Sequence, residues 1–293
     1  MKRSLIVAML ALSVASTGTS VTNPFLAHAA TKTAKKAKTV KQPTVKEIKL
    51  KGAINVRDLG GYKTKNGKTI KKHKLLRSAA LNTLTKTDAQ KLVKTYHLAT
   101  DIDLRTDMEK QKAPDVKIKG VKYVFDPVMK QFSKIGKTES GEKVMEHTYS
   151  QFVTTKTSRQ AYHKLFQALL TNPKNKAVLW HCSAGKDRAG MGSVLVLSAL
   201  GVDRKTINHD FMLSNKFRAS TNKQHLAALT AKGVAKNSLD YKRTKAMDDV
   251  RMAYLNTSYR LIKKDYGSMN NFLHKGIGLS DHDITKLRQM YLK

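Results

Sequence analysis

The sequence has a single cysteine, Cys182, among its 293 residues. A lone thiol can form neither a disulfide within the chain nor a cysteine-rich metal site. In a secreted protein, such an unpaired cysteine indicates a reactive thiol. The chain also lacks internal repeats, a Walker loop and the glycine fingerprint of dinucleotide-binding domains, so no nucleotide cofactor is expected.

Acidic residues are scarce as well. Only 21 Asp and Glu oppose 56 Lys and Arg, which gives a formal net charge of +35. Such a charge attracts phosphorylated ligands, anionic lipid, an anionic cell wall or nucleic acid. Nucleic acid has only the net charge in its favour, because no nucleic-acid-binding motif is present. The basic residues are spread along the chain rather than gathered in one block, so simple solubility explains the charge equally well.

The N-terminus contains no acidic residue and has the three parts of a secretory signal peptide. Lys2 and Arg3 form its charged start, residues 5–14 form a short apolar core, and Ala27-His28-Ala29 fits the cleavage pattern. We therefore expect residues 1–29 to be removed and the protein to be secreted. An uncleaved N-terminal anchor is the alternative, although the apolar run is short for a membrane span.

Residues 30–47 are rich in Lys, Thr and Ala and contain one proline and one acidic residue. This composition predicts a disordered basic linker, either a solvated spacer or a segment that touches an anionic cell wall or lipid headgroups. The chain as a whole is 40% hydrophobic, which is enough for a sizeable core. Residues 48–293 are therefore expected to form one catalytic domain.

Strand and helix patterns alternate along this domain. The predicted strands include residues 99–104, 121–125 and 177–180, and the predicted helices are residues 84–97, 142–152, 158–170, 204–214, 222–232, 246–266 and a last one from Ser280. Thr85 is the expected N-cap of the first helix. This alternation favours an α/β domain with a mainly parallel sheet, which binds ligands beyond the carboxyl ends of its strands. Asp103, Arg105 and Cys182 stand at such ends and are expected to share a site.

The cysteine lies between two apolar segments, which predicts a strand, a tight loop and a helix. A thiol at a helix N-terminus is stabilised as the thiolate, and the loop N–H groups there can bind an anion. Five residues separate Cys182 from Arg188, and the segment reads His-Cys-Ser-Ala-Gly-Lys-Asp-Arg-Ala-Gly. It resembles the phosphate-binding signature of the cysteine-dependent protein tyrosine phosphatases. It is most similar to the bacterial branch whose loop carries Gly-Lys-Asp-Arg and some of whose members also accept phosphoserine, phosphothreonine and phosphoinositides.

Other segments resemble the same branch. They are Asn-Val-Arg-Asp-Leu-Gly-Gly at residues 55–61, Leu-Leu-Arg-Ser at residues 75–78, residues 209–215 and residues 272–292. The resemblance thus spans nearly the whole chain from residue 48 to residue 292. It implies the tyrosine-phosphatase fold, in which helices flank a central, mainly parallel sheet and the C-terminal part is helical.

The resemblance also implies a two-step hydrolysis of a phosphomonoester without metal or other cofactor. Cys182 would attack the phosphorus and form a phosphocysteine, which water would then hydrolyse. Arg188, with its planar fork, would hold two phosphoryl oxygens. His181 would orient the loop rather than act as a base. The backbone N–H groups that hold the remaining charge would come from Ser183, Ala184, Gly185, Lys186, Asp187 and Arg188.

The leaving oxygen needs a proton, and three carboxyl groups are candidates for the general acid. Asp187 lies in the loop and Asp103 at a strand end, and both match acidic positions of the branch. Asp126, which precedes a proline, corresponds in chain order to the mobile acid loop of other tyrosine phosphatases and ranks third. Each of the three could instead form a salt bridge.

Further basic residues could contact an anionic substrate, namely Arg57, Arg77 and Arg105. A structural role, by pairing with Asp58 or by bonding a backbone carbonyl, is favoured for Arg57. Lys186 adds a second cation to the loop. It could favour substrates with more than one phosphate, such as phosphoinositides, or it could only help to stabilise the thiolate.

One position departs from the branch, which usually has Thr or Ser after the signature arginine, whereas this chain has Ala189. The missing hydroxyl would bond the sulfur as it leaves, so its loss is expected to slow hydrolysis of the phosphocysteine. The leading hypothesis is a secreted phosphatase acting on phosphotyrosine, with phosphoserine and phosphothreonine as further candidate substrates. The alternatives are a phosphoinositide phosphatase and a phosphate- or polyanion-binding surface protein with weakened catalysis.

Overall fold

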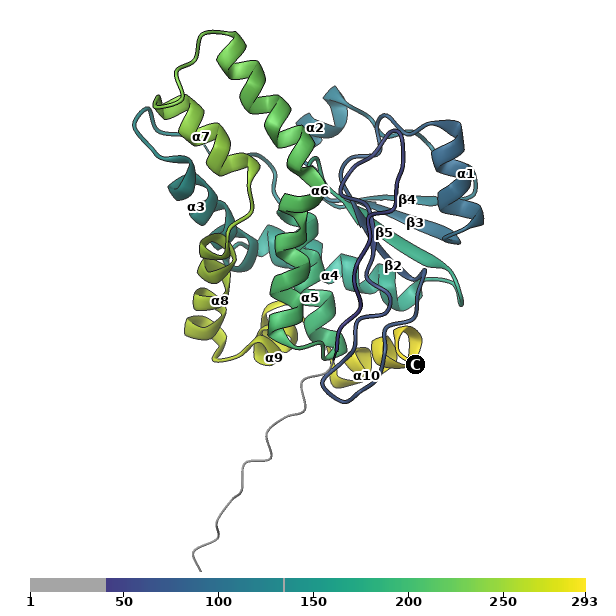
Figure 1. Ribbon diagram of the computed structural model, residues 1–293. Coiled ribbons are helices and arrows are strands. Elements are labelled where there is room, and N and C mark those ends of the chain that lie inside the picture. Colours follow the sequence, from purple (N-terminus) through teal and green to yellow (C-terminus); the bar gives the residue numbers. More distant parts are fainter. Residues whose placement is uncertain (1–40, 134) are drawn as a thin grey trace, which may run out of the picture. The chain divides into compact units, whose positions relative to one another are not determined.

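The structure is a computed structural model that describes residues 41–133 and 135–293 (Figure 1). The expected signal peptide and residues 30–40 of the expected linker lie outside the described residues. Residues 41–47 were also expected in the linker, yet they contact the folded domain. The Gln42 amide donates hydrogen bonds to the Lys63 carbonyl at 3.2 Å and to the Asp203 carboxylate at 3.3 Å. Contacts with the domain therefore begin several residues before residue 48.

A five-stranded sheet in the order β1-β2-β5-β3-β4 forms the centre of the domain. Its strands are β1 (Arg57–Asp58), β2 (Leu75–Ser78), β3 (Leu98–Asp103), β4 (Lys122–Phe125) and β5 (Ala177–His181). All neighbouring strands are parallel except β1, which pairs antiparallel with β2. The predicted α/β class with a mainly parallel sheet is thus confirmed. Because β5 is the middle strand, Cys182 lies at the carboxyl edge in the centre of the sheet.

Helices pack on both faces of the sheet (Figure 1). Along β5, Val178 and Trp180 belong to a large apolar cluster, whereas Ala177 and Leu179 belong to a smaller one that includes Leu92. Successive strand residues point to opposite faces, so this alternation separates the two layers. The helices are α1 (Lys86–Lys94), α2 (Asp107–Lys112), α3 (Gly141–Thr154), α4 (Lys156–Thr171), α5 (Arg188–Leu200), α6 (Arg204–Ala231), α7 (Leu239–Asp248), α8 (Met252–Tyr266), α9 (Met269–Asn271), the π-helical turn η1 (Phe272–Gly276) and α10 (Asp281–Tyr291).

Local capping signals place two of these helices as predicted. The Thr85 hydroxyl accepts a hydrogen bond from the Asp88 N–H at 3.1 Å, and the Asp88 carboxylate accepts one from the Thr85 N–H at 3.0 Å. Ser280 and Asp283 make the same reciprocal pair at the start of α10. Each pair satisfies two N–H groups that a helix start leaves without partners.

The helices after residue 204 have different bounds from the predicted ones. The predicted helices 204–214 and 222–232 are one continuous helix, α6, since no glycine or proline interrupts residues 204–231. The single predicted helix 246–266 is instead α7 and α8, with a break between Asp248 and Met252. At the break, the Asn215 side chain accepts from the Val250 N–H at 2.7 Å and donates to the Val250 carbonyl at 2.8 Å. A long-range partner therefore replaces the helical hydrogen bonds of Val250.

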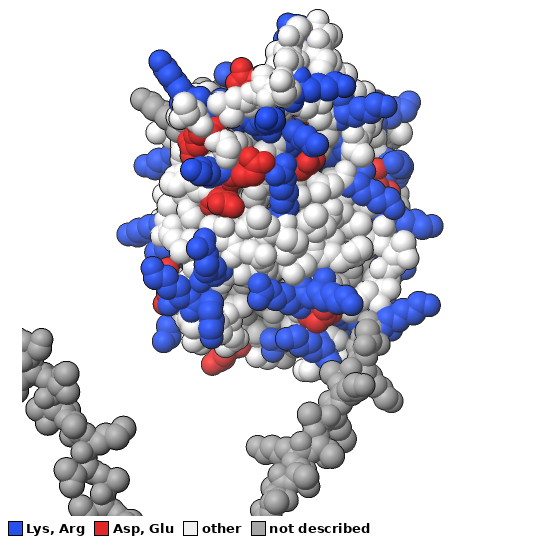
Figure 2. Space-filling view, turned by 60° about the vertical axis from the view of Figure 1, so that its left-hand side comes forward, with Lys and Arg blue, Asp and Glu red and all other residues white. Residues whose placement is uncertain are grey.

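Basic side chains are scattered over the face shown in Figure 2, between uncharged areas and a smaller number of acidic side chains. This spread matches the distribution of Lys and Arg along the sequence. Within residues 41–133 and 135–293, no helix is both long enough and apolar enough to cross a membrane.

Candidate active site

The loop between β5 and α5 turns its carbonyl groups away from its centre. Within residues 41–133 and 135–293, no acceptor is recorded for the backbone N–H groups of residues 183–187. These N–H groups are therefore available to an anion at the N-terminus of α5. The loop carbonyls accept hydrogen bonds from residues outside the loop. The Ala80 N–H donates to the Ser183 carbonyl at 3.2 Å, the Asn55 amide to the Ala184 carbonyl at 3.1 Å, and the Arg77 guanidinium to the Gly185 carbonyl at 2.7 Å.

Gly185 is the position where this loop requires glycine. Its φ is 67°, in the left-handed region that side chains disfavour. A Cβ there would lie 2.4 Å from the Ser78 carbonyl oxygen and 2.5 Å from the Ala79 nitrogen. The backbone that leaves β2 thus presses directly on the loop and fixes its path.

A buried ion network supports the loop from behind. Asp210 of α6 accepts from Arg57 at 3.0 Å and from Arg77 at 2.8 Å, and it also accepts from the Tyr62 hydroxyl at 3.1 Å. Burial alone would raise the pKa of Asp210, but the two guanidinium groups hold it below its ordinary value. Arg57 therefore pairs with Asp210 rather than with Asp58, and it is not among the residues that line the pocket described next.

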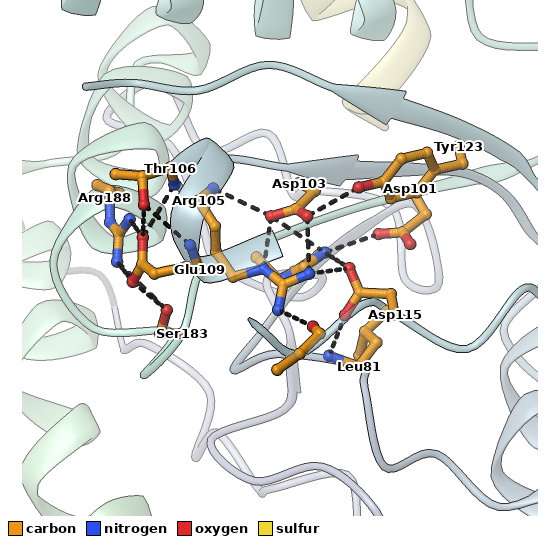
Figure 3. Close-up of polar contacts among 12 residues, drawn as sticks. Leu81, Asp101, Asp103, Arg105, Thr106, Glu109, Asp115, Tyr123, Ser183 and Arg188 are labelled. Atoms are coloured by element: carbon orange, nitrogen blue, oxygen red, sulfur yellow. Dashed lines mark hydrogen bonds and ion pairs between the residues drawn. The ribbon is translucent and has the colours of Figure 1, made fainter. Parts of the chain in front are cut away.

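Arg188 and most of the loop that follows the nucleophile candidate line one pocket of about 500 Å³. Cys182 is a buried free thiol, and Arg188 is the first residue of α5. The Arg188 guanidinium donates to both carboxylate oxygens of Glu109 from α2, at 2.5 and 2.8 Å, and the Ser183 hydroxyl donates to Glu109 as well (Figure 3). Burial would raise the pKa of Glu109, yet the Arg188 contacts lower it to about 2. Glu109 thus accepts from both terminal nitrogens of Arg188. The side edge of the guanidinium, which carries Nε, remains available to bind a phosphoryl group.

Asp187 is the acid candidate that the structure places at this pocket. Its carboxylate lines the pocket and accepts from the Tyr149 hydroxyl at 2.9 Å and from the Lys186 ammonium at 3.1 Å. Lys186 also donates to the Asp249 carbonyl at 3.3 Å and is buried. The ammonium of Lys186 is thus already engaged with protein oxygens.

Asp103 and Arg105 form a separate buried cluster. Asp103 accepts from Arg105 at 2.9 and 2.8 Å and from the Tyr123 hydroxyl at 2.8 Å (Figure 3). Arg105 also donates to Asp115 at 2.6 Å. Burial would raise the pKa of Asp103, but its hydrogen bonds from Arg105 bring it to about 2. Asp103 is therefore held ionised and lacks a proton to donate near neutral pH, and neither residue lines the pocket.

Asp126, the third acid candidate, is buried outside the pocket lining. Burial raises its pKa to about 7, and the nearest cation is Lys164 at 3.8 Å. It can carry a proton near neutral pH, but unlike Asp187 it does not line the pocket of Arg188.

His181 lies fully buried among carboxylates, as a residue that holds the loop would. Its Nε2 is 3.2 Å from Asp115 and 3.5 Å from Asp101. Burial would lower the pKa of His181, but the carboxylates raise it to about 9, so the ring is charged near neutral pH and is no base. The ligand atoms of these three residues lie within 4.8 Å of one another, as a metal site requires. Arg105, however, already donates a hydrogen bond to the Asp115 carboxylate, so these residues form an ion cluster with Arg105.

Three residues that contact the loop did not emerge from the sequence. Glu109 belongs to a Thr-x-x-Glu capping box with Thr106, a signal that could have located the start of α2 but not its contact with Arg188. Tyr149 of α3 and Arg218 of α6 carry no local signal, because both reach the loop from distant helices.

Comparisons with sequences and with solved structures relate this chain to known proteins. The sequence profile described as "tyrosine phosphatase family" matches residues 48–293. A protein of Cupriavidus necator, named for tyrosine-protein phosphatase activity, is 28% identical over 250 residues, which is 81% of this chain and 85% of that protein. The triple specificity protein phosphatase PtpB of Mycobacterium tuberculosis is 29% identical over 161 residues, which is 53% of this chain and 56% of PtpB. Among solved structures, PTPMT1 in complex with PI(5)P covers 64% of this chain and 95% of its own, at 15% identity and a TM-score of 0.27.

The charged state of His181 predicts a pH-dependent stability. Its pKa is about 9 in the folded chain and 6.5 in its ordinary state, so the imidazolium stabilises the fold fully below pH 6.5 and loses this contribution as the pH rises through 9. We expect the free energy of unfolding, measured by urea denaturation, to fall by about 3 kcal/mol over this window. The His181→Gln variant cannot titrate there and should show a flatter profile. Equal slopes in the two proteins would contradict the assignment.

Proposed function

The chain belongs to the tyrosine phosphatase family, and we propose that it hydrolyses phosphotyrosine through a phosphocysteine intermediate. We also propose that it acts outside the cell, because residues 1–29 have the pattern of a secretory signal peptide. The observation that supports the activity most directly is the loop after β5. Among residues 41–133 and 135–293, it combines a thiol, a set of N–H groups with no recorded acceptor and an arginine that binds Glu109 through its terminal nitrogens and not through Nε.

In the first step, the Cys182 thiolate attacks phosphorus while the phosphorus–oxygen bond to the leaving group breaks. The loop N–H groups and Arg188 hold the equatorial oxygens and the charge that develops on them. Glu109 keeps the Arg188 fork in one orientation, so that less freedom is lost when the phosphoryl group binds. Asp187 gives its proton to the leaving oxygen, since it is the candidate acid that lines the pocket.

In the second step, a water molecule attacks the phosphocysteine and the sulfur leaves as a thiolate. Asp187, now ionised, accepts the proton of that water. Ala189 offers no hydroxyl to the departing sulfur. We therefore propose that release, rather than attack, limits the rate of this enzyme.

The walls of the pocket favour an aromatic phosphate ester. They are largely apolar, and the Phe132 ring lies with its centroid 5.2 Å from the Arg188 guanidinium carbon. An aromatic ring bound beside the phosphate would lie against such walls. The apolar lining comes from Ile54, Met129, Phe132, Ile135, Val144, Met145, Phe152 and Met247. Lys186 does not by itself favour a second phosphate, because Asp187 and the Asp249 carbonyl engage it.

The first test measures phosphate release from a phosphotyrosine peptide by the chain from residue 30 onward. We expect turnover in the wild type and a loss of at least about a thousandfold in Cys182→Ser, since serine cannot supply a thiolate. Matched phosphoserine peptides and phosphoinositides give the breadth of specificity. Turnover that survives Cys182→Ser would refute the mechanism, and peptide binding without turnover from about pH 5 to 8 would favour a phosphate-binding protein instead.

The role of Asp187 is tested with two leaving groups. An Asp187→Asn variant should lose about a hundredfold in kcat on a phosphotyrosine peptide, whose leaving group needs a proton, and much less on p-nitrophenyl phosphate, whose leaving group does not. Asp126→Asn is the matched control and should leave the ratio of the two rates unchanged. If Asp126→Asn changes the ratio and Asp187→Asn does not, Asp126 is the acid.

The consequence of Ala189 is tested by restoring the hydroxyl. We expect Ala189→Thr to raise the steady-state kcat by about 2- to 10-fold, the effect of one added hydrogen bond in the rate-limiting step. The wild type should show a burst of the first product, and the burst should shrink in the variant. Ala189→Val adds the same volume without the hydroxyl and should give no gain. A gain that is equal in both variants would show that shape, not the hydroxyl, limits release.

A further inference from the structure

Arg218 is a buried cation at the active-site pocket, and the residues that the structure describes give it no charged partner. It lies on α6, is only 5% exposed, and lines the same pocket as Asp187 and Arg188. One terminal nitrogen donates a weak hydrogen bond to the Ala184 carbonyl at 3.4 Å, and its Nε has no partner. Burial of a charge is unfavourable unless the charge is paired. The position therefore needs an anion that the described part of the chain does not supply.

The other buried arginines make the contrast clear. Each of them bonds to a carboxylate within 3.0 Å: Arg57 and Arg77 to Asp210, Arg105 to Asp103, and Arg188 to Glu109. For Arg218, no carboxylate partner within ion-pair distance is recorded among residues 41–133 and 135–293. Asp248 also lines the pocket, but its carboxylate faces His225 at 3.2 Å. Arg218 is thus the exception in a chain that otherwise pairs its buried guanidinium groups.

The surroundings of Arg218 form a polar strip along one side of the pocket. Thr221 and His225 follow it at positions i+3 and i+7 of α6, and all three line the pocket. The strip begins beside the Ala184 carbonyl, two residues after the nucleophile. A substrate whose scissile phosphate lies in the loop therefore brings its neighbouring groups against this strip.

We propose that Arg218 binds a second anionic group of the substrate, the carboxylate of an acidic residue next to the phosphotyrosine. The proposal rests on the phosphotyrosine activity proposed above and adds the residue that selects among such substrates. The terminal nitrogens of Arg218, one of which makes only the weak bond to the Ala184 carbonyl, form a planar fork that matches two carboxylate oxygens. The apolar walls opposite accommodate the phosphotyrosine ring, and a peptide supplies both groups on one short segment.

The test uses two phosphotyrosine peptides that differ only in Glu or Gln at the positions flanking the phosphotyrosine. The wild type should have a kcat/KM about tenfold higher for the Glu peptide, with the difference mostly in KM, since the second anion is bound before and during the reaction alike. Arg218→Gln should abolish this preference, and Arg218→Lys should keep part of it. Thermal unfolding of each variant reports on whether it is folded.

Lys223→Gln is the matched control, because it removes one positive charge from an exposed position of the same helix. It should leave the preference for the Glu peptide intact. A wild type that turns over both peptides equally would overturn the proposal while leaving the phosphatase activity standing. A wild type that turns over neither peptide would refute both. If Arg218→Gln instead removes a preference for bisphosphorylated over monophosphorylated phosphoinositides, the second anion is a phosphate and the peptide assignment is wrong.

Discussion

The structure depends on one buried carboxylate. Asp210 pairs with both Arg57 and Arg77 in a place where neither guanidinium reaches solvent, and Arg77 in turn holds the Gly185 carbonyl at 2.7 Å. That carbonyl is drawn outward, and the described part of the chain records no acceptor for the loop N–H groups of residues 183–187. The capacity to bind an anion is therefore set behind the loop, by residues that line no part of the pocket. Loss of the Asp210 charge would leave two buried cations unpaired and release the loop together with them.

The same rule governs the distribution of acidic residues in this basic chain. Carboxylates are few, and several of them lie beside buried arginines rather than on the surface: Asp103 beside Arg105, Glu109 beside Arg188 and Asp210 beside two. This explains why Asp103 is a poor acid although it stands at the expected edge of the sheet. Burial is the strongest single influence and raises the pKa of Asp103, but the hydrogen bonds from Arg105 and the charges of Arg105 and His181 together outweigh it. It also explains why an unpaired buried arginine at a pocket carries information about a ligand.

The sequence predicts what depends on neighbours along the chain. The strand, loop and helix around Cys182, the caps at Thr85 and Ser280, and the α/β class all follow from local pattern. Ion pairs do not, because they join distant segments: Arg57 lies beside Asp58 in sequence but bonds to Asp210, 153 residues away. The break between α7 and α8 has the same origin, since it depends on the side chain of Asn215. A helical pattern alone could not reveal it.

The two halves of the proposed reaction differ in how well the loop supports them. The attack step needs a phosphoryl group that is held in place. The loop N–H groups and Arg188 would bind its oxygens, and Glu109 orients Arg188. Release needs a donor for the sulfur, and residues 182–189 contain one hydroxyl, that of Ser183. Glu109 engages this hydroxyl, and the contact that orients Arg188 for the first step therefore withholds Ser183 from the second. With Ala189 in the position after Arg188, the thiolate is left to the N-terminus of α5 and the loop N–H groups alone.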